Sequence, residues 1–335
     1  MHTALPELNI DDVDLSVEVF SRKLRAPIIV AGMTGGHEAS LAINESIAEV
    51  VNELGLGMGV GSQRVAIEDE SLAYTFSIVR KKAPDSLIIG NIGGAQLIKG
   101  YDIKELNKAI DMVKADAIAI HLNVAQELFQ PEGDKEFKGI TDKISKLSLE
   151  IDKPLIVKEV GNGLSLEVAS KLSATRIAGF DVGGAGGTSW VLVEMYRLLE
   201  GGNKQLADIA STFACWGIPT AASIVETRYV ARDKIVVATG GVRTGLDVAK
   251  AIALGADLVG IALPVLRKVL RSKDKLRAYL EKLIYELKIA MILTGCKSIS
   301  ELQRAPLVIT GYLREWIQQR GIDIKDYLYR RRFRV

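Results

Sequence analysis

The stretch at residues 235–263, which reads IVVATGGVRTGLDVAKAIALGADLVGIAL, limits the possible folds more than any other part of the chain. A short apolar run ends in Gly240-Gly241, and apolar residues with helical spacing follow over 246–253. A second apolar run, 258–262, comes directly after that helix. The order strand, glycine turn, helix, strand predicts a βαβ unit whose strands are parallel.

The glycine turn in this stretch has the features of a phosphate-binding site. Glycines let backbone N–H groups approach an anion, and the guanidinium of Arg243 can bind phosphate oxygens in pairs. Two such turns, after 235–238 and after 258–262, are similar to the phosphate site that follows the last two strands of a (β/α)8 barrel. The alternative is a pair of ordinary connections in which glycine is only a turn residue.

Six further apolar runs precede this unit, most of them at the interval of roughly 30 residues that a βαβ repeat occupies. They lie at 26–32, 56–60, 87–91, 117–121, 154–158 and 177–181. Another apolar run, 218–224, would make a ninth strand, but Pro219 at its start and the apolar spacing up to Tyr229 favour a helix over 219–231. The sequence therefore predicts eight strands and the α/β fold class, as a TIM (β/α)8 barrel.

No linker or shift in composition divides the chain, so we expect one domain over residues 1–335. Residues 1–25 are expected to form an arm or β-hairpin across one mouth of the barrel, and the barrel itself is expected over 26–265. C-terminal helices and a tail are expected over 266–335, with helices near 274–294 and 300–304. The polar loop at 129–138 is interpreted as a lid.

The composition narrows the class of protein. Hydrophobic residues make up 48% of the chain and aromatic residues only 6%, which suits a buried parallel sheet covered by helices. A net charge of +2 argues against a nucleic-acid partner, and the basic tail at 330–334 is interpreted as a solvated end or a subunit contact. No apolar run reaches the ~18 residues of a membrane span and no signal peptide is present, so we expect a soluble cytoplasmic protein.

In a TIM barrel, catalytic groups follow the carboxyl ends of the strands. Here every such end carries glycines or polar residues. We expect one mouth of the barrel to be ringed by Thr34, Ser62, Arg64, Asn91, His121, Asn123, Lys158, Thr188 and Arg243.

Two pairs of these residues, Ser62 with Arg64 and His121 with Asn123, are each separated by one residue. Each pair would point to the same side if strand geometry persists. Arg64 suits a phosphate, because its guanidinium is a charged fork of donors. We interpret His121 as a site residue rather than a structural histidine, since polar residues follow it closely.

Lys158 ends an otherwise apolar strand, where a charge is costly without an anion or an electron-rich group beside it. The alternative is a salt bridge to Glu159 or Asp181. The stretch GGAGGTSW at 183–190 is either a flexible loop or a backbone that lies against a ring or a phosphate. In the second case, the hydroxyl of Thr188 would be a donor.

Glu127 is a candidate ligand for Mg²⁺, which typically takes one or two carboxylates together with substrate phosphates. The alternative is a carboxylate that interacts favourably with the N-terminal end of a helix dipole.

Six motifs stand at or near the strand ends: MTGG (33–36), GSQR (61–64), HLNxxQE (121–127), KExGNG (158–163), GGTSW (186–190) and GGVRTGLDVAKAIALGA (240–256). Taken together, they resemble the type 2 isopentenyl diphosphate isomerases, from about Leu5 to the C-terminus. The last motif also occurs in other FMN barrels such as the 2-hydroxy-acid oxidases, but those oxidases lack the HLNxxQE element.

The resemblance implies a TIM-barrel flavoprotein that interconverts isopentenyl and dimethylallyl diphosphates, as a tetramer or octamer. It implies reduced FMN, NADPH as the reductant, and Mg²⁺ bound by Glu127. The residues implied for FMN are Met33, Thr34, Ser62, Asn91, Lys158, Thr188, Gly240, Gly241, Arg243, Ala262 and Leu263. Those implied for the substrate are Ser62, Arg64, His121, Asn123 and Gln126, with catalytic roles for His121, Gln126 and Glu194.

The family normally begins with a further segment that carries an Arg-Lys pair and a His for gripping the diphosphate, and this chain starts close to where that segment ends. The difference concerns substrate affinity and activity and not the flavin site. Two alternatives therefore stay open: an FMN-dependent 2-hydroxy-acid oxidoreductase, and a flavin-binding paralogue with impaired catalysis. Because the strand ends offer no obvious pair of strong acid and base, we expect reduced flavin to supply the acid–base chemistry.

Overall fold

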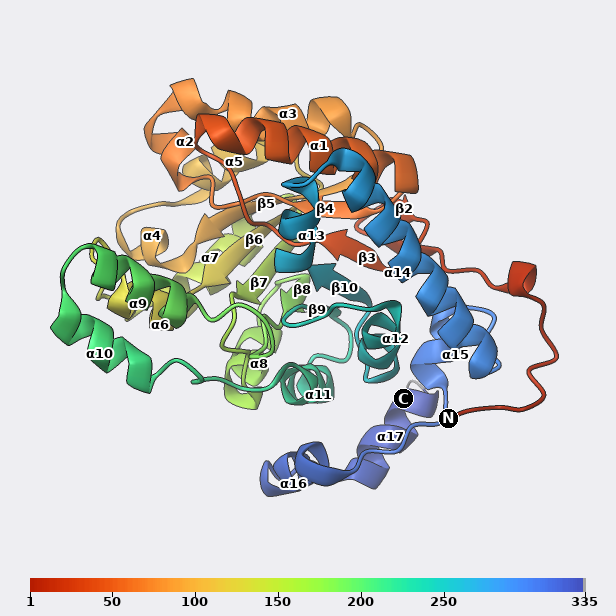
Figure 1. The fold of residues 1–335 in the computed structure, drawn as a ribbon. Helices are drawn as coiled ribbons and strands as arrows, with labels where there is room; N and C mark the ends of the chain where they lie inside the picture. Colours follow the sequence, from red (N-terminus) through yellow and green to blue (C-terminus); the bar gives the residue numbers. More distant parts are fainter. Residues whose placement is uncertain (334–335) are drawn as a thin grey trace.

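Eight short apolar segments form a closed barrel of parallel strands in the computed structural model, which describes residues 1–333 (Figure 1). Each strand pairs with the next, and the last pairs with the first. The TIM barrel and its eight predicted strands are thus confirmed, although several strands are shorter than the apolar runs that predict them. In chain order, the strands are β3 Ile28–Val30, β4 Gly57–Gly59, β5 Leu87–Gly93, β6 Ala117–Leu122, β7 Leu155–Glu159, β8 Gly179–Asp181, β9 Ile235–Ala238 and β10 Leu258–Ile261.

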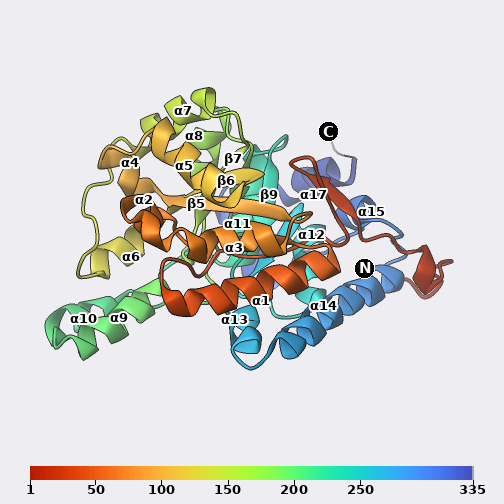
Figure 2. The same ribbon diagram turned by 90° about the horizontal axis from the view of Figure 1, so that it is seen from above.

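Helices surround the barrel and continue beyond it (Figures 1 and 2). Those before β9 are α1 Glu38–Leu54, α2 Arg64–Glu68, α3 Tyr74–Lys82, α4 Gly94–Ile98, α5 Ile103–Val113, α6 Val124–Phe129, α7 Ile140–Glu150, α8 Leu166–Ser173, α9 Trp190–Glu200, α10 Lys204–Thr212 and α11 Thr220–Val230. Those after β9 are α12 Gly245–Ala253, α13 Leu263–Val269, α14 Lys273–Leu293, α15 Ile299–Arg304, α16 Gly311–Gln319 and α17 Ile324–Phe333. The predicted helix at 219–231 is therefore α11, and those near 274–294 and 300–304 are α14 and α15.

The N-terminal arm contains a β-hairpin that closes the amino-terminal mouth of the barrel. Its strands, β1 Val17–Val19 and β2 Arg22–Leu24, are antiparallel and joined by Phe20 and Ser21, which have positive φ angles of 51° and 61°. Val19 and Leu24 are buried in one apolar cluster with residues from the starts of the barrel strands: Ile29, Leu87, Ala117, Ile156 and Leu258. The expectation of an arm or hairpin across one mouth is thus resolved as a hairpin.

A largely buried arginine, Arg80, links α3 to the strands that follow it. The guanidinium of Arg80 donates to Asp116 Oδ2 at 2.8 Å and to four backbone carbonyls, those of Ala83, Pro84, Ser86 and Lys114, at 2.9–3.1 Å. Asp116, just before β6, also accepts a hydrogen bond from the backbone N–H of Ile88. This arrangement, the first arginine clamp, closes the gap between β5 and β6 at the amino-terminal side.

A second arginine clamp repeats this pattern between β9 and β10. Arg228, near the end of α11, donates to Asp257 and to four backbone carbonyls. Three of these carbonyls, those of Ala231, Arg232 and Lys234, lie three, four and six positions after the arginine, and the fourth is that of Gly255. Asp257 accepts from the backbone N–H of Val236, as Asp116 does from Ile88. The spacing from arginine to its first three carbonyls is identical in the two clamps.

The last helices and the N-terminal arm pack together on one side of the barrel. Helix α14 contacts α12, α13 and α1, and the arm runs beside its end, where the backbone N–H of Thr3 donates to Leu293 O at 2.9 Å. In contrast, the α9–α10 pair stands out from the barrel (Figures 1 and 2) and shares a small apolar cluster with Phe129 of α6. None of the described helices is both long enough and apolar enough to cross a membrane.

Candidate active site

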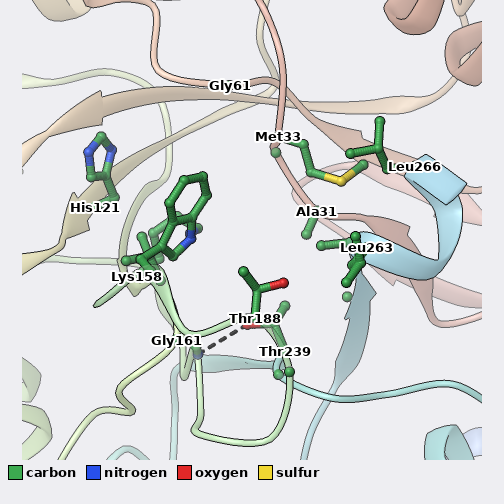
Figure 3. Close-up of a pocket in the computed structure, with 18 of the residues that line it drawn as sticks. Ala31, Met33, Gly61, His121, Lys158, Gly161, Thr188, Thr239, Leu263 and Leu266 are labelled. Atoms are coloured by element: carbon green, nitrogen blue, oxygen red, sulfur yellow. Dashed lines mark hydrogen bonds between the residues drawn. The ribbon is translucent and has the colours of Figure 1, made fainter. Parts of the chain in front are cut away.

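The carboxyl ends of all eight barrel strands open into one cavity of about 980 Å³ (Figure 3). This volume is at the upper end of the range of about 300–1,000 Å³ for small-molecule sites, so it can hold a cofactor and a substrate together. The predicted site residues that line it are Met33, Thr34, Ser62, Arg64, Asn91, His121, Asn123, Gln126, Glu127, Lys158, Thr188, Gly240, Gly241, Arg243, Ala262 and Leu263. Glu194 is the one predicted site residue that does not line the cavity.

Ser62 and Arg64 both line the cavity, although they do not lie on a β-strand, whose alternating side chains would have pointed both to the same side. Strand β4 ends at Gly59, and Arg64 is the first residue of α2. Gln63 between them is buried and faces the protein, where its Nε2 donates to Ala109 O at 2.8 Å and its Oε1 accepts from the N–H of Asn91. The buried amide of Gln63 therefore fixes the loop and leaves its two neighbours to the cavity.

His121 is a neutral imidazole with a defined tautomer. Its Nδ1 lies 2.9 Å from Asn91 Oδ1, and Asn91 Nδ2 donates to Val60 O, so the amide oxygen is the acceptor and Nδ1 carries the proton. Burial and the charges of Lys158 and Arg64 lower the pKa of His121 to about 3. At neutral pH, its Nε2 is thus an unprotonated acceptor.

A chain of hydrogen bonds links the end of β6 to α9. Asn123 Nδ2 donates to Glu127 Oε1 at 2.9 Å and to Gln126 Oε1 at 3.2 Å, and Gln126 Nε2 donates to Glu194 at 3.0 Å. Glu194 is only 1% exposed and also pairs with Arg197. It therefore lies behind Gln126 and orients that amide, and it does not itself line the cavity.

Glu127 is a buried carboxylate on the cavity wall that also fastens the loop after α6. Its Oε2 accepts from the backbone N–H of Asp134 at 2.8 Å, and Asp134 pairs with Lys99 at 2.5 Å. Each carboxylate oxygen keeps a further lone pair, so Glu127 fits a hard cation such as Mg²⁺ as one oxygen ligand. Within residues 1–333, no three His, Cys, Asp or Glu side chains are grouped to hold a metal.

The ammonium of Lys158 is also in the cavity wall and has few partners. Its Nζ donates to the backbone carbonyl of Glu159 at 3.2 Å, and no carboxylate of the described residues lies within 4 Å of it. The alternative of a direct salt bridge to Glu159 or Asp181 is therefore wrong. Lys158 is available to an anionic or electron-rich group in the cavity.

The two carboxylates near Lys158 differ in their surroundings. Glu159 Oε2 accepts the backbone N–H groups of Gly161, Asn162 and Gly163, while burial raises the pKa of Glu159 to about 7. Asp181 accepts from the Thr239 hydroxyl and from Gly183 N–H at one oxygen, and burial raises its pKa against the opposing effect of Lys158.

The glycine turn after β9 packs backbone to backbone against the glycine-rich loop after β8. Gly240 and Gly241 have φ angles of 110° and 79°, and a Cβ at either position would lie 2.1 Å from a carbonyl oxygen, of Gly184 or of Gly186. Arg243 reinforces this contact by donating to the carbonyls of Gly241 and Gly186. Only glycine fits here, as expected for a phosphate cradle made of backbone groups.

The wall beside this cradle is apolar. Met33, Leu263 and Leu266 gather on one side of the cavity, and His121 and Lys158 lie on the other (Figure 3). An apolar wall, a backbone cradle with an arginine, and a lysine across the cavity together fit FMN, which has an aromatic ring, a phosphate and a pyrimidine edge that accepts hydrogen bonds.

Sequence reasoning missed several lining residues. Arg267, Lys268 and Arg271 of the α13 region lie at the cavity mouth, and Lys268 is 5.9 Å from the ring centroid of Tyr279 of α14. Their only signal in the sequence is proximity to the last phosphate turn. Gln96, Trp190 and Asp181 also line the cavity.

Comparisons with known proteins agree with this geometry. The model of the family described as FMN-dependent dehydrogenase matches residues 106–309. An isopentenyl-diphosphate delta-isomerase of Ignicoccus hospitalis is 52% identical over 96% of this chain and 89% of that protein. The chain belongs to the isopentenyl-diphosphate delta-isomerase family. A second member, from Sulfurisphaera tokodaii, is 51% identical over 100% of this chain and 91% of its own length.

Solved structures show the same fold at much lower identity than these isomerase relatives. A mandelate oxidase variant has a TM-score of 0.62 at 18% identity, over 92% of this chain and 87% of its own. A lactate oxidase from Pediococcus acidilactici has a TM-score of 0.63 at 19% identity, over 93% and 83%. At this identity the likeness concerns the barrel alone, and the isomerase family is distinguished by its close relatives.

Proposed function

We propose that this protein is an FMN-dependent isomerase that interconverts isopentenyl diphosphate and dimethylallyl diphosphate. The observation that carries the proposal is the group of polar side chains after β6, where His121, Asn123, Gln126 and Glu127 line the same cavity as the glycine cradle. The relatives at 44–52% identity, all named as isopentenyl-diphosphate delta-isomerases, support it.

FMN would be held by groups from seven of the eight strand ends, all except that of β6. Bound in its reduced form, FMN supplies acid–base groups at the site, because moving a double bond requires one proton to be added and another removed. Lys158 would stabilise negative charge on its pyrimidine edge. The residues proposed to hold it are Met33, Thr34, Ser62, Asn91, Lys158, Thr188, Gly240, Gly241, Arg243, Ala262 and Leu263.

The substrate would bind between the end of β6 and α2. Arg64, His121 and Asn123 would bind the diphosphate, and Glu127 would bind Mg²⁺ together with diphosphate oxygens. Gln126, whose amide is fixed by Asn123 and Glu194, would position the hydrocarbon end. These residues position the reacting carbons and exclude water from them.

We further propose NADPH as the reductant, with its phosphates at the cavity mouth. Arg267, Lys268 and Arg271 line this mouth, and none of the three forms an ion pair within 4 Å with a described residue. A cluster of cations without counter-charges suits the phosphate groups of a dinucleotide. Alanine at Arg267 and Arg271 should raise the KM for NADPH without slowing isomerisation after reduction by dithionite.

The test of the isomerase proposal is an anaerobic assay in D₂O with reduced and with oxidised FMN. Turnover of isopentenyl diphosphate should need the reduced form and should place deuterium in the product, although no electrons leave with it. Equal rates with oxidised flavin would contradict the acid–base role of the flavin. A product without deuterium would contradict the protonation step itself.

The same holoprotein preparation also tests the two alternative functions. Oxidation of lactate or mandelate by the oxidised holoprotein, without isomerase activity, would favour a 2-hydroxy-acid oxidoreductase. Tight FMN binding with neither activity would indicate a flavin-binding paralogue with impaired catalysis.

We also propose that the protein is a homo-oligomer, a tetramer or octamer, in which a second copy covers the outer face of α9 and α10. Large apolar side chains are exposed on these helices and in the turn that follows α10, namely Tyr196, Leu199, Ile209, Phe213 and Trp216. Analytical ultracentrifugation of the wild type and of Trp216→Ser tests this assignment, because a monomeric wild type would contradict it.

A further inference from the structure

Asp181 is a buried carboxylate to which the proposed chemistry gives no role. It is the last residue of β8 and pairs in register with Lys158 of β7. Both residues line the main cavity and also a small cavity of about 20 Å³ inside the barrel, where Asn91 is the other polar side chain. This small cavity has the volume and the polar partners that one bridging water requires.

The hydrogen bonds of Asp181 fix the position of its carboxylate but involve only one of its two oxygens. The Thr239 hydroxyl and the Gly183 N–H both donate to Oδ1, and no described residue donates to Oδ2. The carboxylate is therefore held in one orientation by the neighbouring strand end while its second oxygen stays available to the cavities.

Among the residues that the structure describes, Lys158 has no other comparable counter-charge. Glu159 is its sequence neighbour, but three backbone N–H groups already meet the charge of that carboxylate. The other charged or titratable side chains that interact with this region are Arg64, which is also cationic, and His121, which is neutral. The positive charge of Lys158 on β7 is thus balanced chiefly by the carboxylate of Asp181 on the neighbouring strand, β8.

We propose that Asp181 is the counter-charge of Lys158 and, through it, sets how much more tightly the protein binds reduced FMN than oxidised FMN. This inference rests on the proposed FMN site. In a buried site, a lone ammonium would strongly favour the anionic reduced cofactor, because charges interact strongly where water is excluded. The negative charge of Asp181 moderates this preference and keeps the reduced cofactor basic enough to exchange protons. Asp181 is accordingly a positioning residue that acts through Lys158.

The proposal fixes the sign of two effects. Asp181→Asn removes the opposing charge and should raise the ratio of the FMN dissociation constants, oxidised over reduced, by tenfold or more. For a two-electron couple this is a rise of about 30 mV in the midpoint potential. Lys158→Ala should move the same potential in the opposite direction.

The experiment is a spectroscopic redox titration of the anaerobic holoprotein against reference dyes at pH 8, with no isopentenyl diphosphate present. Glu159→Gln is the matched control, because it neutralises a second carboxylate beside Lys158 whose charge is already met by backbone groups. Its potential should move by less than half as much as that of Asp181→Asn. A purely structural role of Asp181 would weaken both redox states equally and leave the potential unchanged.

An unchanged or lowered potential in Asp181→Asn overturns the proposal. Asp181→Ser is a second neutral variant that takes the place of Asp181→Asn in this test if the latter does not fold or bind FMN, and the same outcomes then decide. The outcome is independent of isomerase activity, since no substrate is used. A wild type that binds FMN without isomerising would contradict the proposed function and leave this test intact.

Discussion

The protonation state of His121 determines whether its side chain can donate a hydrogen bond to an anion in the cavity. In the free protein its Nε2 accepts hydrogen bonds, whereas a diphosphate needs donors. We therefore predict that the imidazole of His121 takes up a proton when inorganic diphosphate binds at pH 7. In His121→Asn this part of the proton uptake should be lost, and diphosphate should bind about tenfold more weakly. Calorimetry in two buffers of different ionisation enthalpy measures the uptake. Equal uptake in the variant would show that the proton goes elsewhere.

The lowered pKa of His121 also predicts how stability depends on pH. The imidazole titrates near 6.5 in the unfolded chain and near 3 in the folded protein, so the unfolded chain binds more protons between these values. Stability should therefore fall as the pH drops through this window. The melting temperature of His121→Asn should fall less than that of the wild type between pH 7.5 and 4.5. Parallel losses in the two proteins would contradict this prediction.

The carboxylate of Glu127 is predicted to matter for the cation and not for the flavin. Glu127→Gln should raise the half-saturating Mg²⁺ concentration at least tenfold and change the FMN dissociation constant less than twofold, because an amide lacks the charge of a hard ligand. Glu132→Gln, in the exposed part of the same loop, is the control. If both variants keep the Mg²⁺ dependence of the wild type, the metal role of Glu127 is wrong.

The sequence predicted those site residues whose side chains follow a strand end directly. Arg64 and His121 belong to short motifs next to apolar runs, and barrel geometry alone brings such residues together. The sequence did not show that Glu194 is separated from the cavity by Gln126, because that depends on the packing of α9 against α6. Nor did it place Arg267 at the mouth, since α13 looks like an ordinary surface helix in sequence.

At the level of elements, the two arginine clamps join helix ends to strands with similar contacts. Replacing Arg80 or Arg228 by alanine would leave several backbone carbonyls without their donor. It would also remove one cation from Asp116 or Asp257, which keep Arg22 and Gln303 as partners. We predict a loss of about 3–5 kcal/mol in unfolding free energy for each, chiefly from the unpaired carbonyls. Arg277→Ala, which removes an exposed pair with Glu53, should change it by about 0.5 kcal/mol or less. Urea unfolding of the three variants checks this, and a small effect at either clamp would contradict it.

Element types were predictable where the apolar period was clear. The proline at 219 and the spacing after it correctly predicted α11 rather than a ninth strand. The hairpin stayed undecided because Phe20 and Ser21 are not typical of turns with two positive φ angles. No helix was predicted at 311–319, where α16 buries Ile317 and only part of Leu313 and Trp316.

At the level of the whole molecule, we propose that the chain unfolds as one domain stabilised by its cofactor. Calorimetry should show a single transition, and FMN at 100 times its dissociation constant should add about 2.7 kcal/mol to the free energy of unfolding, with a matching rise in melting temperature. Two separate transitions would contradict the single domain. No binding of FMN at high micromolar concentration would remove the basis of the flavin site.

The matching of the two arginine clamps also bears on the ancestry of the barrel. Each clamp lies between the third and fourth strands of a four-strand set, β3–β6 or β7–β10, with the same spacing to its carbonyls and the same aspartate contact to the preceding strand. Duplication of one ancestral half, followed by fusion, leaves this kind of internal repeat. The carboxyl ends of β5 and β6 would then correspond to those of β9 and β10, and both pairs would derive from one ancestral pair of strand ends. In the first copy they carry Asn91 and His121, on the proposed substrate side, and in the second Gly240 and Ala262, at the proposed cofactor phosphate.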